Sequence, residues 1–218
     1  MMDKKELIVT RAGRFFHEGD LVNLGIGMPT QVVNHLPEGV EILLQSENGF
    51  LGLGPAPAPG QEEKDVVNAG GKPVSIVPGG VCFDSATSFA LIRGGHVDAT
   101  VLGALEVDQE GNIANWMVPG KMVPGMGGAM DLVAGAKLVI ITMEHCTKQG
   151  EPKILKRCTL PLTATHEADY IVTELCVLHH TEAGLVLEEL APGITVEEVL
   201  AKTEAELIIP ETIGCMVD

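Results

Sequence analysis

The segment ILLQSENGFLGLG, residues 42–54, sets an apolar run directly against a polar turn. Residues 40–45 are mostly apolar and predict a strand that ends where the SENG turn begins. The Asn-Gly pair favours a turn, because both residues tolerate a positive φ. Apolar residues and glycines resume after the turn. A solvated turn carboxylate is the simplest interpretation of Glu47, but its position at a strand end, between apolar flanks, makes it a candidate functional residue.

Strands and helices alternate along the chain on both sides of this segment. The predicted strands cover residues 21–24, 40–45, 74–78, 97–102, 137–143, 171–178 and 185–187. The predicted helices are one capped by Asp3 and ended by Gly19, and others over 30–36, 84–92, 128–133 and 195–206. This alternation predicts an α/β fold, an open and largely parallel sheet with helices on both faces. No convincing linker interrupts it, so we expect a single domain over residues 1–218.

In such a sheet, functional sites are expected in the loops that follow the carboxyl ends of the strands. Three loops qualify, at residues 25–29, 46–54 and 124–128, and we expect them to converge along one edge. Two of them are glycine-rich and expose backbone N–H groups where a helix begins, a setting that favours negative charge. The candidate donors are Gly25, Gly27, Gly125, Gly127 and Gly128. Such donors around Glu47 would resemble an oxyanion site.

The charge balance excludes some partners. The chain has 14 Lys and Arg against 30 Asp and Glu, which gives a formal net charge of −16. A nucleic-acid binder needs a basic face, and anionic lipid attracts basic segments, so neither nucleic acid nor membrane is an expected partner. An anionic ligand must then be held by local dipoles, by a partner's charge, or by a few basic residues. Lys121, Lys137 and Lys148 are the candidates near the third loop.

Cysteine and histidine spacing gives no sign of a metal centre. The five cysteines form no C-x-x-C pair, and their odd number favours reduced thiols in a cytoplasmic protein. The histidines lack the spacing of metal ligands, so no metal site is expected. The sequence contains no apolar run of about 18 residues, the length of a membrane span. A lone Gly25-x-Gly27 is weak evidence for nicotinamide binding, because Thr30 stands where a third glycine belongs.

The residues alone leave the role of Glu47 open between general base and nucleophile. A retaining glycosidase also uses a glutamate nucleophile, but one Trp and one Tyr offer few sugar platforms. A sugar-phosphate isomerase-like or ligand-sensing domain of the same architecture is a further alternative, and it needs no nucleophile. As a nucleophile, Glu47 would form a mixed anhydride, which apolar surroundings would protect from water.

Four motifs together resemble one family. LQSENGFLG (44–52), VNLGIGMPT (22–30), SFALIRGGHVD (88–98) and GMGGAMDLV (125–133) closely resemble the B (beta) subunit of family I coenzyme A transferases, of the butyrate–acetoacetate and 3-oxoacid types. The likeness extends over nearly the whole chain and is least diagnostic after about residue 194. The SENG block is its most specific part.

The resemblance implies transfer of CoA from a short-chain acyl-CoA to a carboxylate such as acetate, by ping-pong chemistry through a glutamyl-CoA thioester on Glu47. It implies that Gly25, Gly27, Gly125, Gly127 and Gly128 line the CoA site, and that Asn48 holds the turn or contacts substrate. CoA is then a substrate, and no permanently bound cofactor, metal or ATP is needed. The resemblance also implies an A (alpha) subunit as partner, in an α2β2 heterotetramer.

Overall fold

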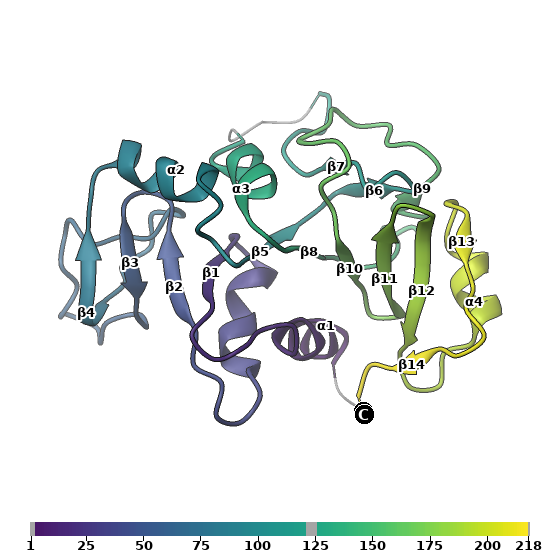
Figure 1. The fold of residues 1–218 in the computed structure, drawn as a ribbon, viewed down its shortest axis with the longest axis horizontal. Coiled ribbons are helices and arrows are strands. Elements are labelled where there is room, and N and C mark those ends of the chain that lie inside the picture. The colour runs from purple at the N-terminus through teal and green to yellow at the C-terminus, as the bar shows by residue number, and fades with distance from the viewer. Residues whose placement is uncertain (1–2, 121–125, 218) are drawn as a thin grey trace.

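A computed structural model describes residues 3–120 and 126–217. Its main sheet crosses the whole molecule (Figure 1). In spatial order its strands are β4 (Ile76–Cys82), β3 (Phe50–Leu53), β2 (Leu43–Ser46), β1 (Leu21–Leu24), β5 (Ala99–Gly103), β8 (Val139–Thr142), β10 (Tyr170–Val172), β11 (Cys176–Thr181), β12 (Gly184–Leu190) and β13 (Leu207–Ile208), with β14 (Gly214–Cys215) also paired to β12. A small second sheet contains β7 (Ile113–Ala114), β6 (Glu106–Asp108) and β9 (Ile154–Leu155).

The centre of the main sheet is parallel. Every pairing from β2 through β1, β5 and β8 to β10 is parallel, while β3, β4, β11 and β12 join through antiparallel pairings. The fold class predicted from the sequence is confirmed, with antiparallel extensions at both sides of the parallel centre. The carboxyl ends of β1, β5 and β8 therefore meet at one edge, where ligands of such sheets bind.

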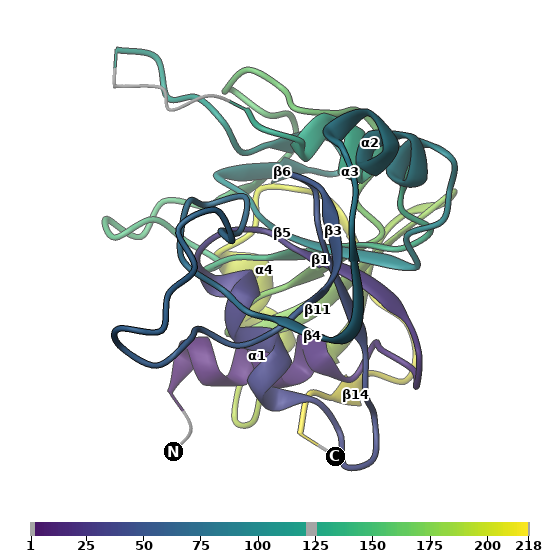
Figure 2. The same ribbon diagram turned by 90° about the vertical axis from the view of Figure 1, so that its left-hand side faces the viewer.

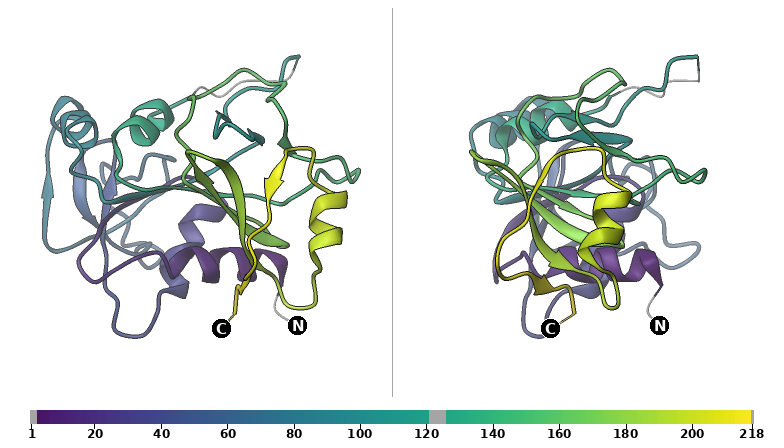
Figure 3. Two further views of the ribbon diagram at one scale, coloured as in Figure 1. Left: turned by 45° about the vertical axis from the view of Figure 1, so that its right-hand side comes forward. Right: turned by 90° about the vertical axis from the view of Figure 1, so that its right-hand side faces the viewer.

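Helices cover both faces of this sheet (Figures 1 and 2). One face carries α1 (Lys4–Gly13) and the 3₁₀ helix η1 (Met28–His35), which pack with Val101 and Ile140. The other carries α2 (Ser85–Arg93), α3 (Ala129–Gly135) and the small sheet, which pack with Leu102 and Ile141. Successive residues of a strand thus pack against helices on opposite faces of the sheet, because side chains alternate along a strand. Near β12 and β13 lies α4 (Val196–Ala201) (Figure 3).

The helix starts follow the capping residues that the sequence contains. Asp3, Asp84 and Thr195 each accept a backbone N–H with the side chain, and Thr195 and Glu198 form the predicted capping box. The ends differ from prediction: α1 ends at Gly13 rather than near Gly19, and α4 stops at Ala201. The predicted helix over 30–36 is the 3₁₀ helix η1.

Two predicted elements were wrong in a way that changes topology. Residues 171–178 form two antiparallel strands, β10 and β11, because the chain reverses where the Thr173 hydroxyl accepts the N–H groups of Leu175 and Cys176. The strand predicted over 40–45 is β2, and β3 returns from it directly in a hairpin, whereas Gly52 and Leu53 were assigned to a loop. In residues 171–178 only Thr173 and Glu174 separate the apolar residues, so periodicity alone does not reveal the reversal there. After the SENG turn, the glycines at positions 52 and 54 made the returning strand resemble a loop.

His145 is fully buried and has a structural role. Its Nδ1 lies 3.0 Å from the Thr173 hydroxyl and its Nε2 lies 2.8 Å from the Thr203 hydroxyl. Both ring nitrogens are thereby satisfied by neutral groups. Burial lowers the pKa of His145 to about 4, because the cationic form is costly to desolvate.

We expect acid to destabilise the protein through this histidine. The unfolded chain binds a proton near the ordinary pKa of 6.5, whereas the folded chain binds it only near pH 4. The free energy of unfolding therefore falls as the pH drops from about 6.5 to about 4, by about 3 kcal/mol in total. Urea unfolding at several pH values measures this slope. His145→Gln should flatten this slope, and an unaltered slope in His145→Gln would contradict the assignment.

Candidate active site

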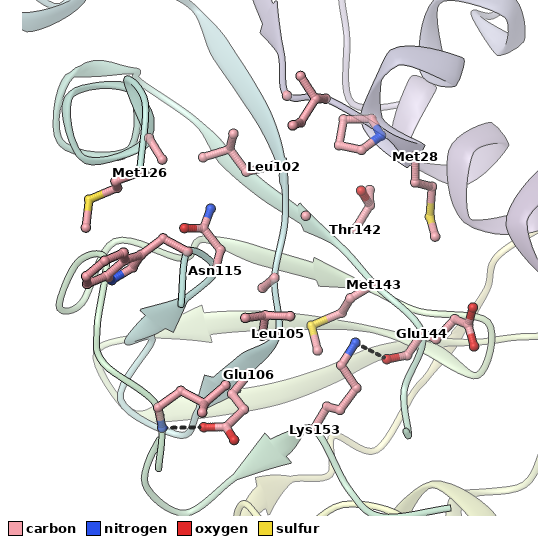
Figure 4. A pocket seen from close by; sticks show the side chains of 18 of the residues that line it. Met28, Leu102, Leu105, Glu106, Asn115, Met126, Thr142, Met143, Glu144 and Lys153 are labelled. Atoms are coloured by element: carbon pink, nitrogen blue, oxygen red, sulfur yellow. Dashed lines mark hydrogen bonds between the residues drawn. The ribbon is translucent and has the colours of Figure 1, made fainter. Parts of the chain in front are cut away.

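A cavity of about 910 Å³ lies at the carboxyl edge of the parallel strands. Gly25 follows β1, Gly103 ends β5, and Thr142 ends β8, and all three line it. Figure 4 shows part of the lining, with Leu102, Met28 and Thr142 on one side and Glu106, Glu144 and Lys153 on the other. Glu47 and Gly128 also line the cavity. The cavity thus lies where the strand order predicts a ligand site.

Glu47 is at the tip of the β2–β3 hairpin. The turn closes through the Gly49 N–H, which donates to the Ser46 carbonyl at 3.0 Å. Gly49 has φ +131°, and a Cβ there would clash with the Phe83 carbonyl oxygen. Only glycine fits this position, so the turn packs tightly against the start of α2. The hairpin therefore holds Glu47, which is half-buried, at the cavity wall.

The Glu47 carboxylate is held by a backbone donor from another loop. The Gly128 N–H donates to Glu47 Oε1 at 3.1 Å, although the two residues are 81 positions apart in sequence. A Cβ on Gly128 would lie 2.9 Å from the same oxygen and 3.2 Å from the Phe89 ring. Gly127 has φ +59° and also lines the cavity. Glycine at position 128 thus permits close contact between this loop and the carboxylate.

Hydrogen bonds to the loop around residues 67–69 also hold the turn in place. The Ser46 hydroxyl donates to Asn48 Oδ1 and accepts the Ala69 N–H at 3.3 Å. Asn48 Nδ2 donates to the Val67 carbonyl at 2.8 Å. The Asn48 side chain is therefore occupied in holding the loop around Ala69 against the turn, and Asn48 is not part of the cavity lining. Of the two roles inferred for Asn48, this geometry favours holding the turn.

Beneath the turn, a buried polar network ties the hairpin to its neighbours. Asn23 Nδ2 donates to Gln45 Oε1 at 2.6 Å, and Gln45 Nε2 donates to the Ser88 hydroxyl at 2.8 Å. The three residues come from β1, β2 and α2, and all are at most 3% exposed. These hydrogen bonds join β2 to β1 and α2, although Asn23 Oδ1 is buried with no hydrogen-bond partner among the described residues. They hold β2, the strand that leads into the Glu47 turn, against its neighbours.

The loop after β1 reaches the cavity, but its glycines differ in role. The Gly25 N–H donates to the Val101 carbonyl at 2.8 Å, so the expected free donor at this position is already engaged. Gly25 still lines the cavity. Gly27, at φ +89°, lies between the lining residues Ile26 and Met28 and is not part of the lining itself. Gly125 falls outside the described residues.

The sequence profile of the coenzyme A transferase family matches residues 5–202. The chain belongs to this family. It is 64% identical over 210 residues to the beta chain of the acetate CoA-transferase of Haemophilus influenzae, covering 96% of this chain and 94% of that protein. It is 49% identical to the B chain of the probable succinyl-CoA:3-ketoacid coenzyme A transferase of Bacillus subtilis, with 98% and 99% covered. The family assignment removes the need for the isomerase-like, sensing and glycosidase alternatives.

A solved structure shares the fold. The apoenzyme of an acyl-CoA transferase from Escherichia coli O157:H7 matches with a TM-score of 0.77 at 22% identity. The match covers 99% of this chain and 43% of that chain, so this CoA-transferase chain spans less than half of the longer protein. At this identity the likeness bears on the fold alone, and it agrees with the α/β architecture described above.

The three loops predicted to converge do so in this CoA-transferase chain as far as the structure describes them. Gly25, Glu47, Gly127 and Gly128 line one cavity, although they are far apart in sequence. Thr142 and Lys153 are among the lining residues that sequence reasoning missed. Thr142 had a detectable signal, because it is a polar residue at the carboxyl end of an apolar strand. Lys153 had none, since its short strand β9 was not predicted.

The few basic residues near the cavity are not equivalent. Lys137 forms an ion pair with Asp98 at 2.7 Å and does not line the cavity. Lys148 lines it and is exposed, and Lys121 falls outside the described residues. Lys153 is half-buried and donates to the Glu144 carbonyl at 3.2 Å, and burial lowers its pKa. Lys148 and Lys153 are thus the positive charges that line this cavity within residues 3–120 and 126–217.

The part of the chain that the structure describes holds neither a metal-binding cluster nor a membrane-spanning helix. No group of three or more His, Cys, Asp and Glu side chains in it has the geometry to hold a metal ion. None of its helices combines the length and apolar character needed to cross a membrane.

Proposed function

We propose that this chain is the beta subunit of an enzyme that transfers CoA between a short-chain acyl-CoA and a carboxylate such as acetate or acetoacetate, with Glu47 as nucleophile. The main support for Glu47 as the nucleophile is the hydrogen bond that the Gly128 N–H donates to Glu47 Oε1 at the cavity. This contact engages one oxygen of the carboxylate and leaves the other for chemistry. That second oxygen is suited to attack a thioester carbonyl.

The reaction proceeds through two covalent states of Glu47. A carboxylate oxygen attacks the thioester carbonyl, the C–S bond breaks, and CoA thiolate leaves an acyl-glutamyl anhydride. The thiolate then attacks the Glu47 carbonyl, which releases the first carboxylate and forms glutamyl-CoA. A second carboxylate attacks this thioester to give a new anhydride and thiolate, and thiolate attack on its acyl carbonyl yields the new acyl-CoA and releases the Glu47 carboxylate. Every intermediate is an anhydride or a thioester, so the acyl group stays activated and no ATP is consumed.

Gly128 has a defined part in this sequence. When thiolate or carboxylate attacks the Glu47 carbonyl, negative charge develops on the Glu47 oxygen that was Oε1. The Gly128 N–H already lies 3.1 Å from that atom, within the range of an oxyanion donor. Apolar lining residues such as Leu24 and Leu102 limit access of water to the anhydride and the thioester.

The partner and the cellular setting are part of the proposal. The relatives described above are named as beta or B chains, which supports an alpha subunit as partner for this chain. We propose an α2β2 assembly in the cytoplasm, with CoA as substrate and no permanently bound cofactor. Residues 1–218 would act as one domain, because strands from residue 21 to residue 215 belong to the same sheet. The alpha subunit would complete the site and add positive charge toward the phosphates of CoA.

Trapping the covalent intermediate tests this function. The chain, assembled with its alpha subunit, is incubated with acetoacetyl-CoA and then treated with borohydride or hydroxylamine. We expect the reduced or hydroxamate product on the peptide that contains Glu47, because glutamyl-CoA is a thioester of that side chain. Peptide mass mapping locates it.

Two controls make the result decisive. The same treatment without acyl-CoA should leave the peptide unmodified, and the chain without its partner should be neither labelled nor active. Modification at any residue other than Glu47 would overturn the mechanism, and normal CoA transfer by the isolated chain would overturn the partner requirement.

A further inference from the structure

Thr142 is a buried polar residue that the chemistry above does not use. Its side chain is 1% exposed, and its hydroxyl has no hydrogen-bond partner among the described residues. The same residue lines the cavity that contains Glu47 (Figure 4). Nearly all buried hydroxyls in folded proteins are paired, because an unpaired one loses its bonds to water without replacement. An unpaired hydroxyl on a ligand cavity therefore lacks a partner that a ligand can supply.

Space for such a partner lies beside Thr142. Gly103 is its neighbour in the register of β5 and β8. Paired residues of parallel strands present their side chains to the same face. A Cβ built on Gly103 would meet only the Thr142 carbonyl oxygen, at 3.9 Å. The missing side chain thus leaves open volume on the face of the sheet that the Thr142 side chain shares, and Met28 of η1 also lines the cavity.

The Thr142 side chain and the contact between Glu47 and Gly128 lie on opposite faces of the main sheet. Thr142 is two residues after Ile140, which packs with α1 and η1. Glu47 instead contacts Gly128 at the start of α3, which packs with α2 on the opposite face. A substrate whose reacting carbonyl is at Glu47 would reach Thr142 only with a second group, beyond the thioester. That group must accept a hydrogen bond if the hydroxyl donates.

We propose that the Thr142 hydroxyl donates a hydrogen bond to a second carbonyl oxygen of the acyl-CoA substrate, in a small subsite between Thr142 and Gly103. This inference rests on the proposed CoA transfer. Two parts of the substrate carry such an oxygen: the 3-oxo group of a 3-oxoacyl chain, and the amides of the pantetheine arm. The first makes Thr142 a specificity residue for the acyl chain, and the second makes it a general contact for CoA.

Thr142→Val in the assembled enzyme tests the proposal, because valine keeps the shape and removes the hydroxyl. We expect kcat/KM for acetoacetyl-CoA to fall about tenfold, the effect of one lost hydrogen bond to substrate. Measurement with acetyl-CoA separates the two sources. A loss confined to acetoacetyl-CoA identifies the 3-oxo group, and an equal loss with both substrates identifies a pantetheine amide. Thr142→Ser should restore most of the activity.

Thr100 provides a matched control. It is 0% exposed, its hydroxyl also lacks a partner among the described residues, and it does not line the cavity. Thr100→Val should leave kcat/KM unchanged for both substrates, and neither valine variant should lower Tm. Gly103→Ala is a second probe, since its methyl group would fill the space beside Thr142 and should reduce kcat/KM for the same substrates as Thr142→Val.

The outcomes separate this inference from the proposed function. If wild-type enzyme turns over and Thr142→Val matches it with both substrates, the subsite is disproved while CoA transfer stands. If Thr142→Val instead weakens assembly with the alpha subunit, the hydroxyl serves the interface and the proposal fails. Absence of wild-type turnover and of trapping at Glu47 would disprove the function itself.

Discussion

Glu47→Gln, assembled with its partner subunit, should lose CoA transfer by at least about 10⁴-fold, the scale seen when an enzyme loses its nucleophile. An amide oxygen is too weak a nucleophile to form the anhydride on which every later step depends. The substitution is nearly isosteric, and the amide oxygen can still accept the Gly128 N–H. The fold should therefore survive, and steady-state assays with acetoacetyl-CoA and acetate measure the loss directly.

The control is another turn glutamate of the same chain. Glu182 is exposed in the turn between β11 and β12, away from the cavity, and Glu182→Gln should retain wild-type activity. Slow deamidation of the glutamine introduced at position 47 would restore the acid, so activity is read on fresh protein and checked with Glu47→Ala. Turnover of Glu47→Ala within tenfold of wild type would refute the nucleophile assignment.

Gly128→Ala should reduce kcat by about 100-fold while the subunit stays folded. The added methyl group would lie 2.9 Å from Glu47 Oε1, closer than real Cβ contacts come, and 3.1 Å from its Cδ, which is tighter than most real contacts. The carboxylate must move away, and it then loses both its hydrogen bond to the Gly128 N–H and its position for attack. A displacement of about 1 Å at a reacting group costs about 10²-fold in rate. Kinetics and Tm of the same preparation separate this effect from unfolding.

The matched control also places an added methyl group beside a glutamate. A Cβ on Gly214 would lie 3.1 Å from Glu189 Cγ, outside the cavity, so Gly214→Ala tests crowding of a glutamate without catalytic consequence. Its kcat should match wild type. The added methyl group would also lie 3.2 Å from the Phe89 ring. The double variant Phe89→Leu with Gly128→Ala removes that ring contact, and we expect it to stay as inactive as Gly128→Ala. Recovery in that double variant would show that Phe89, not Glu47, responds to the methyl group.

The local pattern of the sequence predicted most elements of the parallel centre. Strand 21–24 is β1 with the same bounds, and the caps at Asp3, Asp84 and Thr195 begin helices as expected. These predictions succeed because periodicity and capping depend on neighbouring residues. The β10–β11 reversal was missed because only Thr173 and Glu174 interrupt the apolar residues of 171–178, and periodicity does not distinguish one long strand with two polar residues from two short strands.

The sequence by itself determined the α/β class, the SENG turn and Glu47 as the residue to examine. These follow from residue order and from local rules on turns, caps and apolar periodicity. Only the tertiary structure decided that the Gly128 N–H contacts Glu47, that the Gly25 N–H is engaged with Val101, and that the Thr142 hydroxyl, among the described residues, is unpaired on the cavity. Each of these depends on which distant backbone atoms approach one another, and that is set by packing across the sheet rather than by neighbours in sequence.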